Sequence, residues 1–409
     1  MLDEKGKLAK IINLGQEIAQ IKDVDILLEK VLTVARQFAN ADAGSIYIKE
    51  EDRLRFTYTQ NETLQKKLPP GNKLIYSTFS IPINNESIAG YVGNSGTILN
   101  IPDVYCPPKD APYSFNKEYD EVSQYRTESV LTLPLKNNRG EIVGVLQLIN
   151  AMDEDDHVIS FEREDEPFIT HFANTAAIAI ERAQLTRAII LRMIRMAELR
   201  DPKETGAHVN RVASYSVEVY EKWATRGGTP KEEMEKNKDT LRMAAMLHDV
   251  GKVAISYSIL KIPARLDPHE FEIMKQHTYL GARLFSNPFS DFDEASSIVA
   301  LNHHERWDGR GYPGHINPMT GKAILGYEEE DGKTRSKQGE EIHPFGRIVA
   351  IADVYDALCS KRVYKEPWDE DRVLEVIREE RGKHFDPEVI DAFFASLEMI
   401  QSIKNRYPD

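Results

Sequence analysis

The stretch HHERWDGRGYP, residues 303–313, does most to decide how this chain folds and what it binds. Two adjacent histidines run into a glutamate and then into a glycine-rich turn that ends in proline. A second cluster of the same chemical kind, HDVGK, lies at residues 248–252. Imidazole and carboxylate groups are the ligands that suit Fe, Mn and Zn in proteins. Two such clusters in one chain favour a metal site over isolated surface histidines.

Other histidines and acids extend this pattern. Glu204 and His208 are four residues apart, so they share one face if their segment is helical. Asp353 lies in an apolar helix predicted over residues 345–358, where a buried carboxylate is costly unless it is paired or binds a cation. We therefore expect Asp353 to have a partner in the folded chain.

A predicted helix start precedes the next histidine, His277. Asp267 is predicted as the N-cap, Pro268 as the first helical residue and Glu270 as the partner in a capping box. The segment that leads to His277 is therefore predicted to be helical.

Together these motifs resemble those of the HD-GYP family, the branch of HD-domain phosphohydrolases that cleaves cyclic di-GMP. The resemblance covers about residues 187–405 and implies an all-α domain. It also implies a set of metal ligands that is complete in this chain: His208, His248, Asp249, His277, His303, His304 and Asp353. A complete set implies an active enzyme rather than a degenerate one.

Two features depart from the commoner family pattern. Glu204 is an additional carboxylate, and similarity to family members that bind three metals implies that it is an added ligand. The alternative is an ordinary acid in the first turn of a helix, where the helix dipole favours it. The other departure is the long polar stretch at residues 314–344, for which a lid, a partner loop and a solvated segment all stay open.

The expected chemistry needs two or three divalent metal ions. Such a cluster lowers the pKa of a bound water and neutralises charge on the phosphoryl oxygens. Asp249 is the expected bridging ligand, with His248 beside it and Lys252 near the scissile phosphate. For Lys252, the alternative is a lysine that balances a helix dipole. Imidazole and carboxylate ligation without thiolate tolerates Fe and Mn at least as well as Zn. We expect Fe, with Mn as the alternative.

The resemblance assigns the substrate contacts to a second set of residues. Arg362 and Lys365 are expected to bind a phosphate or a guanine of the dinucleotide, and a planar guanidinium suits either contact. Three further residues are expected to shape the same pocket: Tyr312, Asp356 and Arg347. For Tyr312, the alternative role is to hold the Gly-Tyr-Pro loop against the helices.

The composition limits the class of protein. A formal net charge of −14 argues against a nucleic-acid-binding surface, so an anionic ligand needs a local cationic pocket or metals. No apolar run reaches the roughly 18 residues that span a membrane, and residues 1–5 lack a signal-peptide core. Cys106 and Cys359 are the only cysteines, which fits a reducing cytoplasm and no disulfide framework.

The first 185 residues show a different pattern. An amphipathic helix opens at residues 23–30 and is expected to end near Ala43. Alternating residues within 45–58 predict one β-hairpin, and the segment 129–150 predicts a second. This order of elements predicts an α+β fold with an antiparallel sheet. It resembles a GAF sensory domain at residues 1–185, with its core at about 10–185.

Part of this region resembles the Asn-Lys…Phe-x-x-x-Asp-Glu motif of GAF domains that bind cyclic nucleotides. The matching residues are Asn116, Lys117, Phe161, Asp165 and Glu166. The resemblance implies an ion pair between Lys117 and Asp165 that fastens a loop over a pocket for cyclic GMP or cyclic AMP. The alternatives are a solvated charge pair that contributes little, and a GAF domain that only dimerises.

A helical pattern without proline or glycine runs through residues 168–196 and joins the two regions. About 30 residues at 1.5 Å each span ~45 Å. The apolar side of such a helix needs cover, and a second copy of the same helix is the simplest source. We therefore expect a signalling helix at residues 165–197 and a parallel homodimer formed through it.

These observations lead to one leading hypothesis and two alternatives. The leading hypothesis is a bacterial cytoplasmic enzyme that hydrolyses cyclic di-GMP to linear pGpG, and optionally onward to GMP, under control of the GAF domain. One alternative is an HD-GYP hydrolase of a mixed cyclic GMP-AMP dinucleotide. The other is a catalytically weak module that binds cyclic di-GMP and signals through its surface. Any protein partner is expected at the Gly-Tyr-Pro loop, and neither nucleic acid nor a membrane is expected as a partner.

Overall fold

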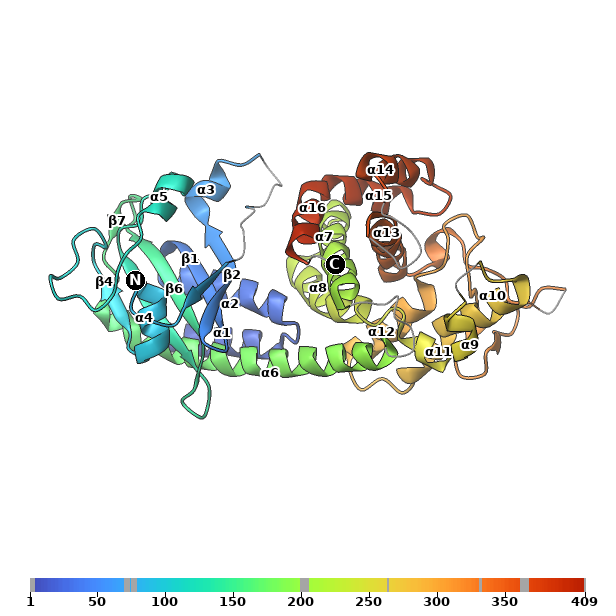
Figure 1. Ribbon diagram of the computed structural model, residues 1–409, viewed down its shortest axis with the longest axis horizontal. Coiled ribbons are helices and arrows are strands. Elements are labelled where there is room, and N and C mark those ends of the chain that lie inside the picture. Colours follow the sequence, from blue (N-terminus) through green and yellow to red (C-terminus); the bar gives the residue numbers. More distant parts are fainter. Residues whose placement is uncertain are drawn as a thin grey trace. The chain divides into compact units, whose positions relative to one another are not determined.

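The computed structural model of the chain describes residues 4–69, 74, 79–198, 206–262, 265–330, 333–360 and 368–407. Contacts divide the chain into two compact units, residues 1–186 and 187–409. Each unit has a hydrophobic core of its own. The prediction of an α+β region followed by a helical region is confirmed (Figure 1).

Unit 1 is built on one antiparallel sheet in the order β3-β2-β1-β6-β5-β4, with β7 paired to β6 (Figure 1). Its strands are β1 (Ala41–Glu50), β2 (Arg53–Asn61), β3 (Ser80–Pro82), β4 (Leu99–Ile101), β5 (Val130–Lys136), β6 (Ile142–Met152) and β7 (Val158–Ile159). Its helical segments are α1 (Glu4–Gln20), α2 (Val24–Phe38), α3 (Glu62–Lys66), α4 (Ile88–Ser95), α5 (Glu118–Ser123), the 3-10 turn η1 (Arg163–Asp165) and the first part of α6 (Glu166–Glu198).

Both predicted hairpins are present, as β1–β2 and β5–β6. The predicted end of the first helix near Ala43 is wrong, because α2 ends at Phe38. Asn40, with a φ of 47°, lies in the left-handed region between α2 and β1. Ala41 then pairs with Ala151 of β6, so the sheet takes residues that the helical pattern had included.

Alternation along the strands sends side chains to two covered faces of the sheet. On β6, Leu146 and Leu148 belong to the core formed with α1, α2 and α6. Val145 points the other way and packs in a smaller cluster with Val92 of α4. The neighbouring strands β5 and β6 are therefore buried on both faces, which explains why apolar residues predominate in both.

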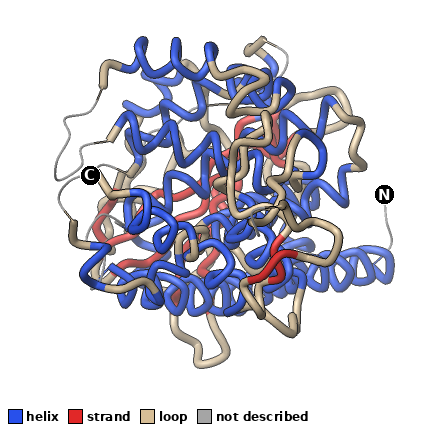
Figure 2. Tube along the Cα trace, turned by 90° about the vertical axis from the view of Figure 1, so that its right-hand side faces the viewer, coloured by secondary structure: helices blue, strands red, loops and turns tan. Residues whose placement is uncertain are grey.

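Unit 2 is helical apart from one short two-stranded ladder in its described part (Figure 2). Its elements are α7 (Gly206–Arg226), α8 (Lys231–Ala245), η2 (Val250–Ala254), α9 (Tyr257–Leu260), α10 (Pro268–Lys275), α11 (His277–Leu284), α12 (Asp291–Asn302), β8 (Ile316–Asn317), β9 (Lys322–Ala323), η3 (Gly339–Glu341), α13 (Pro344–Cys359), α14 (Glu370–Glu379), α15 (Pro387–Ala395) and α16 (Leu397–Arg406). In its core, the Tyr355 ring packs against Tyr215 and Phe393 at centroid distances of 5.5 and 5.2 Å.

Helix α6 contributes to the cores of both units. Ala183 and preceding buried residues belong to the core of unit 1, whereas Ile190 and Ile194 belong to that of unit 2. Five of its large apolar side chains are exposed: Ile178, Leu185, Ile189, Met193 and Met196. Within the described ranges, no helix combines the length and the apolar character needed to cross a membrane.

We expect Phe393→Ala to lower the free energy of unfolding of unit 2 by about 3–5 kcal/mol, because removing this fully buried ring leaves a cavity. Urea unfolding followed by tryptophan fluorescence measures this change, since all three tryptophans lie in unit 2. Phe289→Ala is the matched control, because Phe289 is 98% exposed and its removal should cost less than about 0.5 kcal/mol. Equal effects of the two substitutions would contradict this description of the core.

Candidate metal centre

Most of the predicted metal ligands lie at helix ends. The full predicted set is His208 on α7, His248 and Asp249 after α8, His277 at the start of α11, His303 and His304 after α12, and Asp353 within α13. The predicted capping box is present, with Asp267 and Glu270 each accepting the other's backbone N–H at 2.8 Å. It starts α10, whose C-cap residue precedes His277 directly. Glu204 lies outside the described residues.

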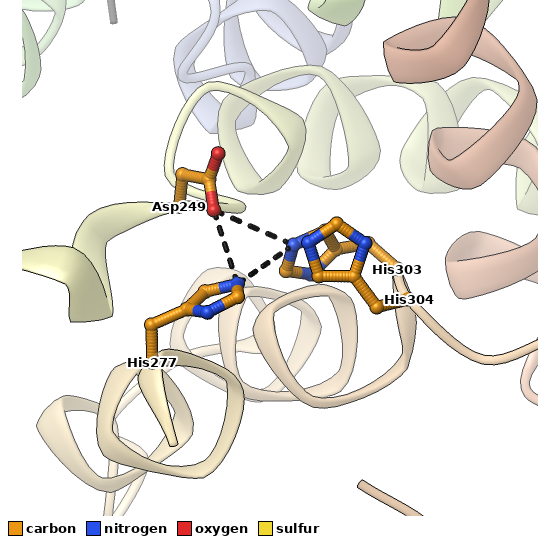
Figure 3. A group of neighbouring side chains, drawn as sticks. All are labelled: Asp249, His277, His303 and His304. Carbon is orange, nitrogen blue, oxygen red and sulfur yellow. Dashed lines mark hydrogen bonds and ion pairs between the residues drawn. The ribbon is translucent and has the colours of Figure 1, made fainter. Parts of the chain in front are cut away.

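Asp249 lies at the centre of a first group of ligands, which it forms with His277, His303 and His304. The ligand atoms of this group lie within 4.8 Å of one another. Asp249 Oδ1 is 3.2 Å from His277 Nε2 and 3.6 Å from His303 Nε2 (Figure 3). This oxygen is buried and accepts no hydrogen bond from the residues that the structure describes. A cation would complete such an arrangement of a carboxylate and imidazole nitrogens.

A second group consists of His208, His248 and Asp353, whose ligand atoms also lie within 4.8 Å of one another. Asp353 Oδ1 is 3.6 Å from His208 Nε2 and 4.0 Å from His248 Nε2. His248 Nε2 is 3.3 Å from Asp249 Oδ2, so the Asp249 carboxylate has one oxygen toward each group. That placement suits the bridging role predicted for Asp249.

Backbone carbonyls orient three of the histidines. In His248, His277 and His303, Nδ1 lies 2.8, 2.7 and 3.0 Å from the carbonyl oxygen three residues earlier. A neutral ring whose Nδ1–H donates to a carbonyl presents Nε2 as an acceptor, which is a common tautomer of metal-binding histidines. The local backbone therefore prepares these rings for metal before any metal binds.

A buried ion pair orients His208 in the same way. Asp356 Oδ2 is 2.8 Å from His208 Nδ1, and Arg211 donates to the two oxygens of Asp356 at 2.6 and 2.9 Å. Burial opposes the charge of Asp356, but its bonds with His208 and Arg211 lower its pKa to about 2. Asp356 is 1% exposed, which favours this orienting role over the predicted contact with substrate.

The sequence interpretation missed Arg211, although a signal for it was present. Arg211 follows His208 by three residues, and Asp356 follows Asp353 by three, so each pair shares one helix face. A basic residue and an acid placed one turn after two ligands are positioned to support them from behind.

The electrostatics of the site suit a bound cation. Burial opposes the charge of Asp249, yet Lys252 and His248 hold its pKa well below the usual range. Burial lowers the pKa of His303, and it lowers that of His304 further together with the neighbouring His303. The carboxylate is therefore ionised and these imidazoles are neutral, which are the states in which both bind metal.

Lys252 and Tyr312 lie at the edge of the first group. Lys252 Nζ donates to Asp249 Oδ2 at 2.7 Å. The Tyr312 ring packs on the His304 ring with 4.9 Å between centroids, and it lies 5.9 Å from the ring of Phe271. These contacts hold the Gly-Tyr-Pro loop on a ligand of the site, whereas the contact of Tyr312 with substrate stays a prediction.

The long stretch at residues 314–344 bonds to the residues on either side of His303 and His304. At its beginning, Glu305 Oε1 accepts the Gly314 N–H at 2.6 Å. Near its end, Lys337 donates to the Asn302 side chain at 2.8 Å. These bonds argue against a merely solvated segment and leave the other two roles open.

Three of the residues assigned to the substrate receive no direct support from the structure. Arg362 and Lys365 lie outside the described residues. The Arg347 guanidinium donates to Asp386 and to the Ile342 carbonyl, each at 2.7 Å. Contacts of these three residues with substrate stay predictions.

In unit 1, the ion pair implied between Lys117 and Asp165 is not formed among the described residues. The Lys117 ammonium lies 4.8 Å from the centre of the Tyr105 ring instead. Lys117 is exposed just before α5, where a ring face attracts its charge.

The other residues of this motif have separate surroundings. Asn116 donates to Glu118 at 3.2 Å on the exposed surface. Phe161 is buried in the core, and Glu166 accepts from Asn100 at 2.8 Å. The motif therefore contributes to packing and to a local hydrogen bond, while its contact with a ligand stays a prediction.

Comparison with known families assigns both units. Residues 23–180 match the family described as GAF domain, and residues 205–358 match the family described as HD domain. The chain is a GAF domain followed by an HD domain. Both groups of ligand atoms lie within the range that matches the HD domain.

Curated relatives are about one-third identical to this chain over the residues that align. It is 33% identical over 232 residues to a Vibrio cholerae protein named 3'3'-cGAMP-specific phosphodiesterase 2, which covers 57% of the chain and 39% of the relative. It is 35% identical over 235 residues to a Vibrio cholerae protein named probable cyclic di-GMP phosphodiesterase, covering 56% of the chain and 48% of the relative. A Thermotoga maritima protein named cyclic di-GMP phosphodiesterase is 34% identical over 248 residues, which are 61% of the chain and 56% of the relative. The matches thus span 39–56% of the length of these relatives.

We expect Gly251→Ala to lower the metal content of the HD domain. A Cβ at Gly251 would overlap the carbonyl oxygen of His277 and the backbone nitrogen of Gly281, so α11 would have to move together with His277. Elemental analysis of the purified variant measures the loss. Gly227→Ala is the control, because the nearest neighbour of its Cβ would be the Trp223 carbonyl oxygen at 3.6 Å. Full metal occupancy in Gly251→Ala would show that this close approach does not position His277.

Proposed function

We propose that this chain is a metal-dependent phosphodiesterase that hydrolyses cyclic di-GMP to linear pGpG, with the GAF domain as its regulator. The observation that carries the proposal is the convergence of buried imidazole and carboxylate groups from separate segments of the HD domain. The names of the relatives support the class of substrate, because they are cyclic dinucleotide phosphodiesterases.

The two groups of ligands fit two divalent ions. The first ion would be held by Asp249, His277, His303 and His304, and the second by His208, His248 and Asp353, with Asp249 between them. Such ions supply a water of lowered pKa and neutralise charge on the phosphoryl oxygens. Fe is the proposed metal and Mn is the alternative, and imidazole and carboxylate ligands without thiolate accept both at least as well as Zn. Glu204 is proposed to hold a third ion.

The chain's own side chains prepare the site for an anionic substrate. Lys252 places an ammonium group at the edge of the first group, where a phosphate would approach. Arg211 and Asp356 keep Nε2 of His208 directed toward the site. Arg362 and Lys365 are proposed to bind the second phosphate or a guanine.

A mixed cyclic GMP-AMP dinucleotide is the second candidate substrate. The observation that favours it is the 33% identity to the relative named for 3'3'-cGAMP. Both dinucleotides present the same phosphodiester groups to the metal ligands. Only contacts with the bases can distinguish the two substrates, and Arg362 is the proposed guanine contact.

The purified chain loaded with Fe or Mn should open cyclic di-GMP to pGpG faster than it opens 3'3'-cGAMP. Product chromatography under matched conditions measures both rates and separates pGpG from GMP. Arg362→Ala should raise KM without changing the metal content, because this residue lies outside the ligand set. Faster turnover of 3'3'-cGAMP would shift the proposal to the second substrate.

The same assay has three metal controls. His303→Ala should lose metal and activity together, since His303 belongs to the first group of ligands and the proposed reaction needs the bound ions. Glu204→Ala should lower the stoichiometry from about three ions to about two, and an unchanged stoichiometry would remove the third ion from the proposal. Full activity of a chelated, metal-free sample would refute metal dependence altogether.

We also propose a parallel dimer along α6. Its five exposed apolar side chains fall within about 80° of one another around the helix, at 3.6 residues per turn. A second copy of the helix would cover this stripe. Ile189→Asp should convert the dimer to a monomer in analytical ultracentrifugation, because the interface would bury a charge. Arg195→Asp, at an exposed position off the stripe, should leave the dimer intact. Survival of the dimer in Ile189→Asp would exclude this interface.

Cyclic GMP or cyclic AMP is the proposed ligand of the GAF domain. The match to the GAF family and the exposed side chains of Asn116 and Lys117 support it. Calorimetry on the full chain should detect binding of one of the two nucleotides, and Lys117→Ala should weaken it. Absence of heat with both nucleotides would leave this domain as a dimerisation unit or as a sensor of another ligand.

A further inference from the structure

Unit 2 contains a cavity of about 440 Å³ that none of the predicted metal ligands lines. It opens among the C-terminal part of α7, the helix α8, the helix α12 and the start of α13. These helices pack directly on one another, so the cavity lies within the same bundle that carries the metal ligands.

The inner wall of the cavity is aromatic. Tyr220 is 2% exposed and Phe345 is 8% exposed, with 5.7 Å between their ring centroids. Trp223 lies 6.2 Å from Tyr220 and is half-buried. Its indole Nε1 is buried and donates no hydrogen bond to the described residues. Such a wall offers flat apolar surface and ring faces that attract cations.

The rim of the cavity carries an excess of negative charge. Lys236 and Asp291 neutralise each other in an ion pair of 2.6 Å. The exposed carboxylates of Glu233 and Glu294 also line the cavity, and neither forms an ion pair within the described part of the chain. Two carboxylates therefore stay available above an aromatic wall.

We propose that this cavity binds an organic cation, meaning an ammonium or guanidinium group carried on an aromatic or apolar body. The body would lie against Tyr220, Trp223 and Phe345, and the cation would lie near Glu233 and Glu294. An anion such as a cyclic dinucleotide would be repelled by the same carboxylates, so this is a site for a different class of ligand from the proposed substrate.

The position of the cavity gives the bound cation a route to the metal centre. On α7, Tyr220 follows His208 by twelve residues, about 18 Å along the helix. On α13, Phe345 precedes Asp353 by eight residues, about 12 Å. A ligand that shifts these helices at one end would therefore shift ligands of the metal at the other. The cavity is thus an effector site of the HD domain.

Three probes of equal body and different charge test the binding step: 2-phenylethylammonium, 2-phenylethanol and 3-phenylpropionate. Calorimetry on the metal-loaded full chain should find the ammonium bound most tightly and the carboxylate least. The double variant Glu233→Gln, Glu294→Gln should weaken binding of the ammonium by roughly tenfold and leave the alcohol unchanged. Glu232→Gln, on α8 but outside the lining, is the matched control.

The aromatic wall has its own variant. Trp223→Leu should weaken the binding of all three probes, because each carries the same phenylethyl group. Equal affinity for the three probes, or affinity for the ammonium that the double variant does not change, would overturn the proposal. The double variant replaces two exposed side chains, so its result does not depend on how Trp223→Leu folds.

A second readout tests the route to the metal centre. The affinity of the chain for Mn²⁺, measured by electron paramagnetic resonance, should change by about fivefold or more when 2-phenylethylammonium is bound. This measurement does not use turnover, so failure of the proposed enzymatic activity would not affect it. Binding of the ammonium without a change in Mn²⁺ affinity would show a ligand site that is not an effector site.

Discussion

The carboxylate of Asp249 is the group on which the HD domain depends. One of its oxygens faces His277 and His303, and the other faces His248 and Lys252. A buried carboxylate is tolerable only when positive or hydrogen-bonding groups surround it. Its partners come from the end of α8, from η2, from α11 and from α12. The charge of Asp249 is therefore balanced only when these segments pack together.

Local sequence rules located the site because its ligands lie where helices begin and end. A capping box starts α10 and a C-cap ends α12, and each depends on a few residues that are adjacent in the sequence. The carbonyl three residues before His248, His277 and His303 is equally local, so ring orientation follows once each segment is helical. The convergence of the segments required tertiary contacts, which the sequence indicated only through its family resemblance.

The errors of the sequence interpretation have the opposite character. Helical periodicity predicted too late an end for α2. Ala41 instead pairs with Ala151, more than a hundred residues later in the sequence, and this pairing competes with helix formation. The predicted partner of Lys117 was an acid distant in sequence, whereas its ammonium group lies over the ring of Tyr105. The role of Asp356 in orienting His208 was missed, because its partner Arg211 lies on another helix. Each error concerns a contact whose two members come from different elements.

Because α6 contributes to two cores, it limits where a fragment that contains the HD domain can begin. The match to the HD family begins at residue 205, but the apolar core of unit 2 includes Ile190 and Ile194, which lie earlier. A fragment that begins at the family boundary would uncover the surface that these two side chains bury. The folding unit is therefore longer than the unit of sequence similarity, and its true N-terminal limit lies inside the helix that belongs equally to the GAF domain.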